Sequence, residues 1–196
     1  KNDTFREYCE RIAHLLAEDP EVDLEPIRTE LLGKVRENIR ISRHQRLSVE
    51  GNGLVAAYIH TGAKVGVLAE VGAGKEATTT NDDFKQLVKD ITLQIAAASP
   101  VAVDKDGVDP AVIEKEKEII SSSDVMKDKP PQAIAKIIEG KIEKYYKENC
   151  LLNQGFVKRN GEVSVGEYVA EVAKKLDDEI VVRRFFRFQV GEAISQ

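Results

Sequence analysis

Residues 53–71 read GLVAAYIHTGAKVGVLAEV, and this stretch decides the fold. Two β-rich segments, 54–60 and 64–71, are joined by Thr61-Gly62-Ala63, in which Gly62 can take a positive φ. The pattern predicts a β-hairpin. Between Ile39 and Val49, apolar and polar residues alternate with period two, which predicts another strand. We therefore expect a three-stranded antiparallel meander over this region.

Helical periodicity flanks the hairpin on both sides. Upstream, apolar residues fall on one helical face over 4–18, and a second helix is expected over about 24–35. Downstream of the loop 72–80, an apolar stripe from Phe84 to Ala98 predicts an amphipathic helix that ends at Ser99-Pro100. Because a sheet with one apolar face must bury it, we expect this helix to cover the meander.

Residues 109–149 have a different character. Asp109-Pro110 predicts a helix start, and the following helix is heavily charged with a thin apolar seam. A break at 121–131 precedes a return helix with a similar seam. Two such helices predict an antiparallel, coiled-coil-like hairpin that projects from the core.

The end of the chain returns to the core. Ser164 and Glu167 form a capping-box pattern that opens a helix, and 180–190 predicts a last strand. The predicted fold class is α+β, with an antiparallel meander sheet packed by helices and a projecting antiparallel helical hairpin.

Composition excludes several classes of function. The net charge is −5 over 196 residues and both signs are mixed, so nucleic acid is not the expected partner. No apolar run approaches the ~20 residues that a membrane span needs. The two cysteines, Cys9 and Cys150, are too few for a disulfide framework and lack metal-binding spacing, so we expect them to be small core residues in a reduced, intracellular protein.

One stretch resembles a phosphate-binding loop. Gly72, Gly74 and Lys75 follow a strand and lead into a helix, as in a P-loop. However, Ala69 stands where the motif needs its first glycine, and Glu76 where it needs a hydroxyl. A P-loop-like nucleotide-binding enzyme that uses Gly72–Lys75 is therefore the alternative interpretation, and a polar strand-to-helix loop is the preferred one.

No other catalytic or metal-binding constellation stands out. His14, His44 and His60 lack zinc-binding spacing, and each is interpreted as a surface residue. No serine lies in a nucleophile elbow, and the carboxylates fall on solvated helix faces. We expect no catalytic residue, no cofactor and no metal, which favours a binding protein over an enzyme.

Several segments, taken together, resemble elongation factor Ts, the family that binds elongation factor Tu and promotes release of its GDP. The resemblance covers nearly the whole chain in the family's order. It is carried by GKVRENIRISR at 33–43, the hairpin at 53–71, LVKDITLQIAAASP at 87–100, VDPAVIEKEKEI at 108–119, KPPQAIAKIIEGKIEKYYKENCLLNQGFVK at 129–158 and VVRRFFRFQVGE at 181–192.

The resemblance implies a domain organisation and a partner. Residues 1–37 would be the helical end of an N-terminal core subdomain. Residues 38–108 and 150–196 would form the C-terminal core subdomain, with 109–149 as the helical hairpin inserted in it. Elongation factor Tu would be the partner, in the bacterial cytoplasm or an organelle.

The resemblance also implies contact residues. By position, the family's contacts with elongation factor Tu fall on Val35, His60, Val157 and Lys158. Phe186 stands where some short members carry a cysteine that links two subunits, so a homodimer stays open but a disulfide in the last strand is not expected.

The family's T-D-F-V motif, which disturbs the magnesium site of elongation factor Tu, would lie immediately upstream of Lys1. We therefore expect the sequence to be a piece of a longer chain. A third interpretation is a structural interaction module that docks through the hairpin 109–149.

Overall fold

A computed structural model describes residues 3–35, 37–123 and 129–192. The chain divides into two compact units, residues 1–47 (unit 1) and residues 48–196 (unit 2). Among the described residues, none of the helices combines the length and apolar composition that a transmembrane span requires.

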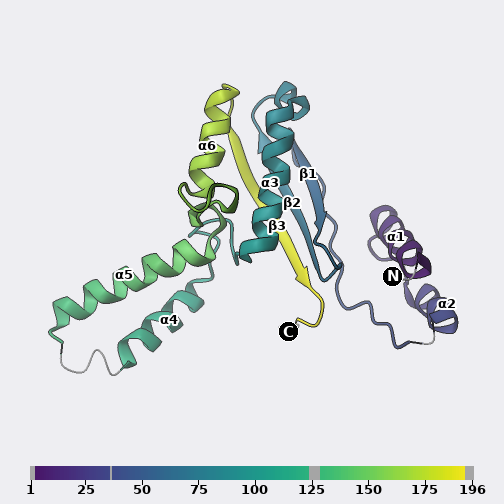
Figure 1. The fold of residues 1–196 in the computed structure, drawn as a ribbon. Coiled ribbons are helices and arrows are strands. Elements are labelled where there is room, and N and C mark those ends of the chain that lie inside the picture. The colour runs from purple at the N-terminus through teal and green to yellow at the C-terminus, as the bar shows by residue number, and fades with distance from the viewer. Residues whose placement is uncertain (1–2, 36, 124–128, 193–196) are drawn as a thin grey trace. The chain divides into compact units, whose positions relative to one another are not determined.

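Unit 1 contains two helices, α1 (Asp3–Glu18) and α2 (Glu25–Val35), as Figure 1 shows. Both predicted helices are confirmed, each within one residue. Their apolar faces form one cluster because the buried side chains of each helix recur at helical spacing. The buried members are Tyr8, Ile12, Leu16, Ile27 and Leu31.

The prediction of a strand between Ile39 and Val49 is wrong. Residues 37–50 contain no helix or strand. Ile39 and Ile41 pack against the apolar cluster of unit 1, which accounts for their alternation with exposed neighbours. Alternation of apolar and polar residues with period two indicates which side chains are buried. A β-strand also needs a neighbouring strand with which its backbone can form hydrogen bonds.

The sheet of unit 2 consists of β1 (Gly53–Ile59), β2 (Val65–Ala73) and β3 (Ile180–Gln189). It is an antiparallel meander in the order β1-β2-β3, so the predicted fold class is confirmed although its third strand comes from the end of the chain. The predicted turn is also confirmed, with Gly62 at φ +92° and Ala63 at +55°.

Helices cover one face of this sheet. Val67, Ala69 and Val71 of β2 lie in the main core with α3 (Asp82–Ala98) and α6 (Val165–Lys175), which Figure 1 shows over the strands. The predicted capping box of Ser164 and Glu167 opens α6. The 3₁₀ turn η1 (Glu76–Thr80) connects β2 to α3.

Two helices, α4 (Pro110–Ser122) and α5 (Pro131–Asn149), pack against each other (Figure 1). Their seam buries Ile113, Ile120 and Ile142, and Asp109 caps α4 as predicted. The predicted break at 121–131 lies partly outside the described residues. After α5, two short 3₁₀ turns, η3 (Leu151–Asn153) and η4 (Val157–Arg159), lead back to α6.

Candidate functional site

The turn η4 carries two of the four predicted contact residues. Phe156, just before the turn, is 2% exposed and stacks on Tyr168 of α6, with ring centroids 4.4 Å apart and planes inclined by 11°. Val157 is 44% exposed, and Lys158 is exposed as well. The buried ring therefore fixes the turn and leaves the next two side chains facing solvent.

Helix α3 holds the same turn through two buried polar side chains. Asp90 and Gln94 are four residues apart and so share one helical face. The Val157 amide donates to Gln94 Oε1 at 2.9 Å. The Lys158 ammonium lies 2.5 Å from one oxygen of Asp90, and the Tyr168 hydroxyl donates to the other at 3.0 Å. Burial and the Asp90 carboxylate raise the pKa of Tyr168, so its phenol stays protonated and remains a donor.

His60 directly follows β1 and lies at the turn that joins β1 to β2. Its side chain is exposed, and its Nδ1 lies 3.1 Å from the hydroxyl of Tyr58. Its backbone is fixed by bonds from its amide to Val65 and from the Ala63 amide to its carbonyl. The turn is thus rigid at the backbone and open at the imidazole.

Val35 is the last residue of α2 in unit 1, where it packs half-buried against the apolar cluster. The structure thus brings Val157 and Lys158 together in one turn. It places His60 in the same unit at a different turn, and Val35 in the other unit.

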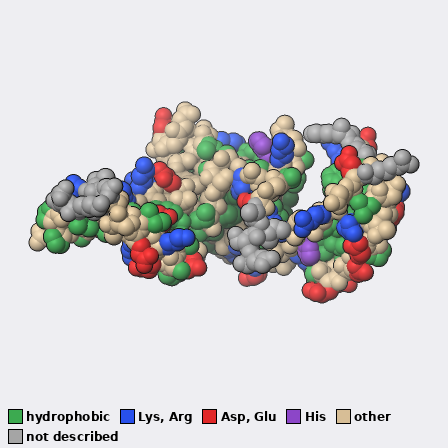
Figure 2. Space-filling view, turned by 90° about the horizontal axis from the view of Figure 1, so that it is seen from below, with side chains coloured by type: hydrophobic (Ala, Val, Ile, Leu, Met, Phe, Trp, Pro, Cys, Tyr) green, Lys and Arg blue, Asp and Glu red, His purple; other side chains and the backbone are tan. Residues whose placement is uncertain are grey.

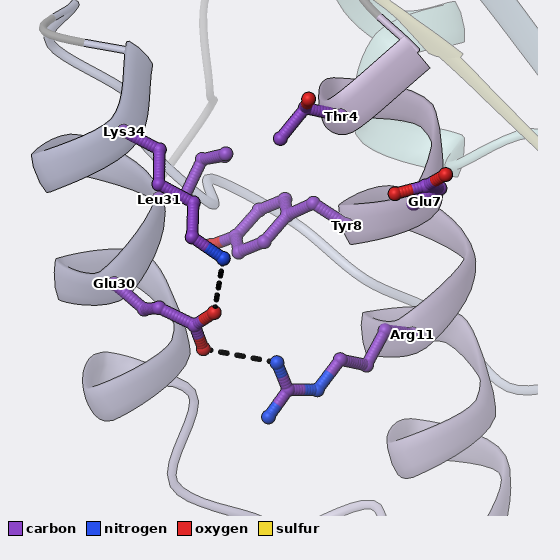
Figure 3. Close-up of a pocket in the computed structure, with 7 residues that line it drawn as sticks. All are labelled: Thr4, Glu7, Tyr8, Arg11, Glu30, Leu31 and Lys34. Carbon is purple, nitrogen blue, oxygen red and sulfur yellow. Dashed lines mark hydrogen bonds and ion pairs between the residues drawn. The ribbon is translucent and has the colours of Figure 1, made fainter.

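A small cavity of about 160 Å³ lies between α1 and α2 (Figure 3). The Glu30 carboxylate bonds Arg11 at 2.9 Å and Lys34 at 2.7 Å beside it. The Tyr8 hydroxyl is buried and, among the described residues, has no hydrogen-bond partner. The lining residues are Thr4, Glu7, Tyr8, Arg11, Glu30, Leu31 and Lys34. Three of the charged groups beside the cavity, those of Glu30, Arg11 and Lys34, are thus paired with one another.

The phosphate-loop alternative at Gly72–Lys75 does not match the geometry. A phosphate site needs free backbone amides, but the Gly74 amide donates to the Glu179 carbonyl and the Lys75 amide donates to Asp178. Gly72 is paired with β3, and the Lys75 ammonium contacts the Asp177 carbonyl. These groups fasten the loop to the segment before β3.

Other candidate chemistry is limited. Across residues 3–35, 37–123 and 129–192, no group of three or more His, Cys, Asp or Glu side chains is placed to hold a metal ion. Figure 2 shows Lys and Arg interspersed with Asp and Glu over the face in view. The expectation that both cysteines are core residues is half wrong, since Cys150 is buried but Cys9 is exposed.

The sequence interpretation missed Asp90 and Gln94. Both are polar residues in the helix that carries the long apolar stripe, and both are buried. A buried polar side chain needs a hydrogen-bond partner. Polar residues beside the apolar stripe of a helix were therefore the sequence signal that could have pointed to Asp90 and Gln94.

Known proteins supply independent findings. The family described as elongation factor TS matches residues 1–192. The elongation factor Ts of Thermoanaerobacter sp. (strain X514) is 45% identical over 147 residues, which is 75% of this chain and 72% of that protein. That of Alkaliphilus oremlandii is 38% identical over 183 residues, covering 89% of this chain and 84% of that protein. That of Heliobacterium modesticaldum is 45% identical over 148 residues, or 76% and 68% of the two chains.

Proposed function

The chain belongs to the elongation factor Ts family, and on that premise we propose that Val35, His60, Val157 and Lys158 contact elongation factor Tu. The chain is a nucleotide exchange factor for elongation factor Tu and acts in translation elongation. It is not an enzyme.

An exchange factor works by differential binding. It holds the nucleotide-free conformation of its GTPase more tightly than the nucleotide-bound one, and by linkage it lowers the affinity for GDP by the same factor. We expect Val157 and Lys158 to contribute to a surface that grips elongation factor Tu away from the nucleotide pocket.

The exposure of Val157 is the observation that carries the proposal. A 44% exposed valine directly after a buried, stacked Phe156 is an apolar side chain held in solvent by a fixed backbone. Preorganised apolar side chains of this kind lose little conformational entropy on binding, so they suit a contact residue.

Binding of nucleotide-free elongation factor Tu, measured by isothermal titration calorimetry, tests this proposal. We expect Val157→Ala to weaken binding by at least about fivefold, or about 1 kcal/mol. The release of a fluorescent GDP analogue from elongation factor Tu should slow by a similar factor. Val112→Ala is the matched control, because Val112 is 40% exposed on α4. Loss of affinity in Val112→Ala but not in Val157→Ala would instead favour docking through the helical hairpin.

The finer assignments stay part of the proposal. We place residues 1–37 in an N-terminal core subdomain and residues 38–108 with 150–196 in a C-terminal one, with 109–149 as an inserted hairpin. We expect a cytoplasmic protein, as in bacteria.

Any self-association is expected to be independent of a disulfide in the last strand, because Phe186 occupies that position. Light scattering coupled to size-exclusion chromatography, with and without a reductant, measures this directly. A dimer that reductant dissociates would have to be linked through Cys9 or Cys150, of which only Cys9 is exposed.

A further inference from the structure

Two buried glutamines join three parts of unit 2. Gln94 of α3 is 0% exposed and Gln154, after η3, is 4% exposed. The Gln94 amide nitrogen donates to Gln154 Oε1 and to the Gly155 carbonyl, both at 3.2 Å, while its oxygen accepts from the Val157 amide. Because a backbone amide only donates and a carbonyl only accepts, these partners fix which end of the Gln94 side chain is oxygen.

Gln154 ties this contact to two helix ends. Its amide nitrogen donates to the carbonyl of Ala98, the last residue of α3, at 3.1 Å and to that of Glu148, near the end of α5, at 2.8 Å. Carbonyls at a helix C-terminus have no partner within the helix, so Gln154 satisfies two groups that burial would otherwise penalise. The base of the helical hairpin is thereby linked through Gln154 and Gln94 to the turn η4.

Asp90 is the second anchor of the turn. Its side chain is buried, and its carboxylate binds the Lys158 ammonium, the Tyr168 hydroxyl and the side-chain amide of Gln86. Gln86, Asp90 and Gln94 follow one another at intervals of four residues, so they form one polar stripe on α3. Two members of the stripe contact the two exposed residues of η4.

We propose that Gln94 and Asp90 are positioning residues for the recognition of elongation factor Tu, an inference that rests on the proposed contacts of Val157 and Lys158. Both side chains are buried, so they act through the turn and do not touch the partner. A turn of three residues is too short for cooperative helical structure, so Gln94 and Asp90 hold it together with the buried Phe156 ring. Without either anchor we expect Val157 and Lys158 to be less well ordered before binding, which lowers affinity.

A double-mutant cycle on the full chain, with binding to nucleotide-free elongation factor Tu as the readout, tests the inference. We expect Gln94→Ala to weaken binding about tenfold. The double variant, Gln94→Ala with Val157→Ala, should bind with the same affinity as whichever single variant binds less tightly. Ile91→Val is the control: Ile91 is 0% exposed on the same helix, and its variant loses stability while keeping affinity within about twofold. Additive effects of Gln94→Ala and Val157→Ala would overturn the inference.

A second cycle combines Asp90→Asn with Lys158→Ala and decides the case if Gln94→Ala does not fold. Asparagine retains an acceptor for the Tyr168 hydroxyl but lacks the charge that holds Lys158. We therefore expect Asp90→Asn to weaken binding about fivefold. Its effect should not add to that of Lys158→Ala. The outcomes separate the two proposals. If Val157→Ala and Lys158→Ala weaken binding but Gln94→Ala and Asp90→Asn do not, only the positioning role fails. If none of the four variants changes affinity, the proposed contacts fail as well.

Discussion

The carboxylate of Glu70 accepts a hydrogen bond from Arg184 Nε at 2.8 Å, although the Glu70 side chain is completely buried. Its other oxygen accepts from Arg183 at 2.9 Å and from the Glu50 amide at 2.8 Å. Arg184 also donates to the carbonyl of Ser48 at 3.2 Å. This cluster fastens residues 48–50, which lead into β1, to the sheet.

Replacing Glu70 should destabilise unit 2. Glu70→Ala leaves two guanidinium groups and one amide without their shared acceptor, so we expect a loss of about 2–4 kcal/mol in the free energy of unfolding. Glu50→Ala is the control, because the Glu50 side chain is 70% exposed where it pairs with Arg184, and its loss should cost at most about 1 kcal/mol. Equal losses in chemical denaturation would contradict the special role of Glu70.

The same carboxylate should make stability depend on pH. Burial alone would raise the pKa of Glu70, but hydrogen bonds from the Glu50 amide and the two arginines outweigh it and hold the pKa below its usual value. A carboxyl whose folded pKa is lowered contributes stability that is fully present above the unfolded pKa, about 4.3, and is lost as pH falls through the folded pKa. The difference in unfolding free energy between wild type and Glu70→Gln should therefore be constant from about pH 7 to 5 and shrink below about pH 4.3. A difference that grows on acidification would have the wrong sign.

Most elements of the fold could be predicted from the sequence because their signals are local. Ser164 and Asp109 each cap the helix that follows, and Gly62 permits the hairpin turn. Strand pairing is not local: alternation at Ile39 resembles a strand, and only the structure shows that β2 pairs instead with β3.

The site was predictable only in part, for the same reason. The resemblance supplied Val157 and Lys158 as expected contacts, since both belong to a recognisable motif. Asp90 and Gln94 act through residues more than sixty positions away in the sequence, and no spacing rule links them. Both side chains are buried because η4 packs on α3, and the sequence alone does not show that these two segments are in contact.

The two thiols should differ sharply in reactivity. Cys9 is exposed on α1 and Cys150 is buried, while reduced hydration of the sulfur raises the pKa of both thiols. Since the thiolate is the reactive form, labelling of Cys9 should be slow at pH 7 and faster at pH 9. Mass spectrometry after a short exposure to iodoacetamide should find one label on Cys9 in the native protein and two labels in denaturant. Native labelling of Cys150 at the same rate would show that the base of the hairpin opens readily.

Removal of the Tyr8 hydroxyl should be neutral or stabilising. The hydroxyl is buried and has no hydrogen-bond partner among the described residues, so folding removes it from water without compensation. We expect Tyr8→Phe to change the free energy of unfolding by between zero and about 1 kcal/mol in the stabilising direction, as measured by thermal denaturation. A loss of more than about 1 kcal/mol would mean that the hydroxyl binds a group in the cavity beside it.

Removal of the Tyr168 hydroxyl should do the opposite. This hydroxyl donates to Asp90 at 3.0 Å in a buried setting, and its loss leaves the carboxylate with Lys158 and Gln86. We expect Tyr168→Phe to cost about 1–2 kcal/mol of stability, because a hydrogen bond to a charged group is lost while the stack on Phe156 is retained. Tyr58→Phe is the matched control, since across the described residues of unit 2 its hydroxyl bonds only the exposed His60, and its loss should change stability by less than about 0.5 kcal/mol. If Tyr168→Phe is as mild as this control, the Asp90 carboxylate is held by its lysine and glutamine partners alone, and the tyrosine contributes to the turn only through its ring.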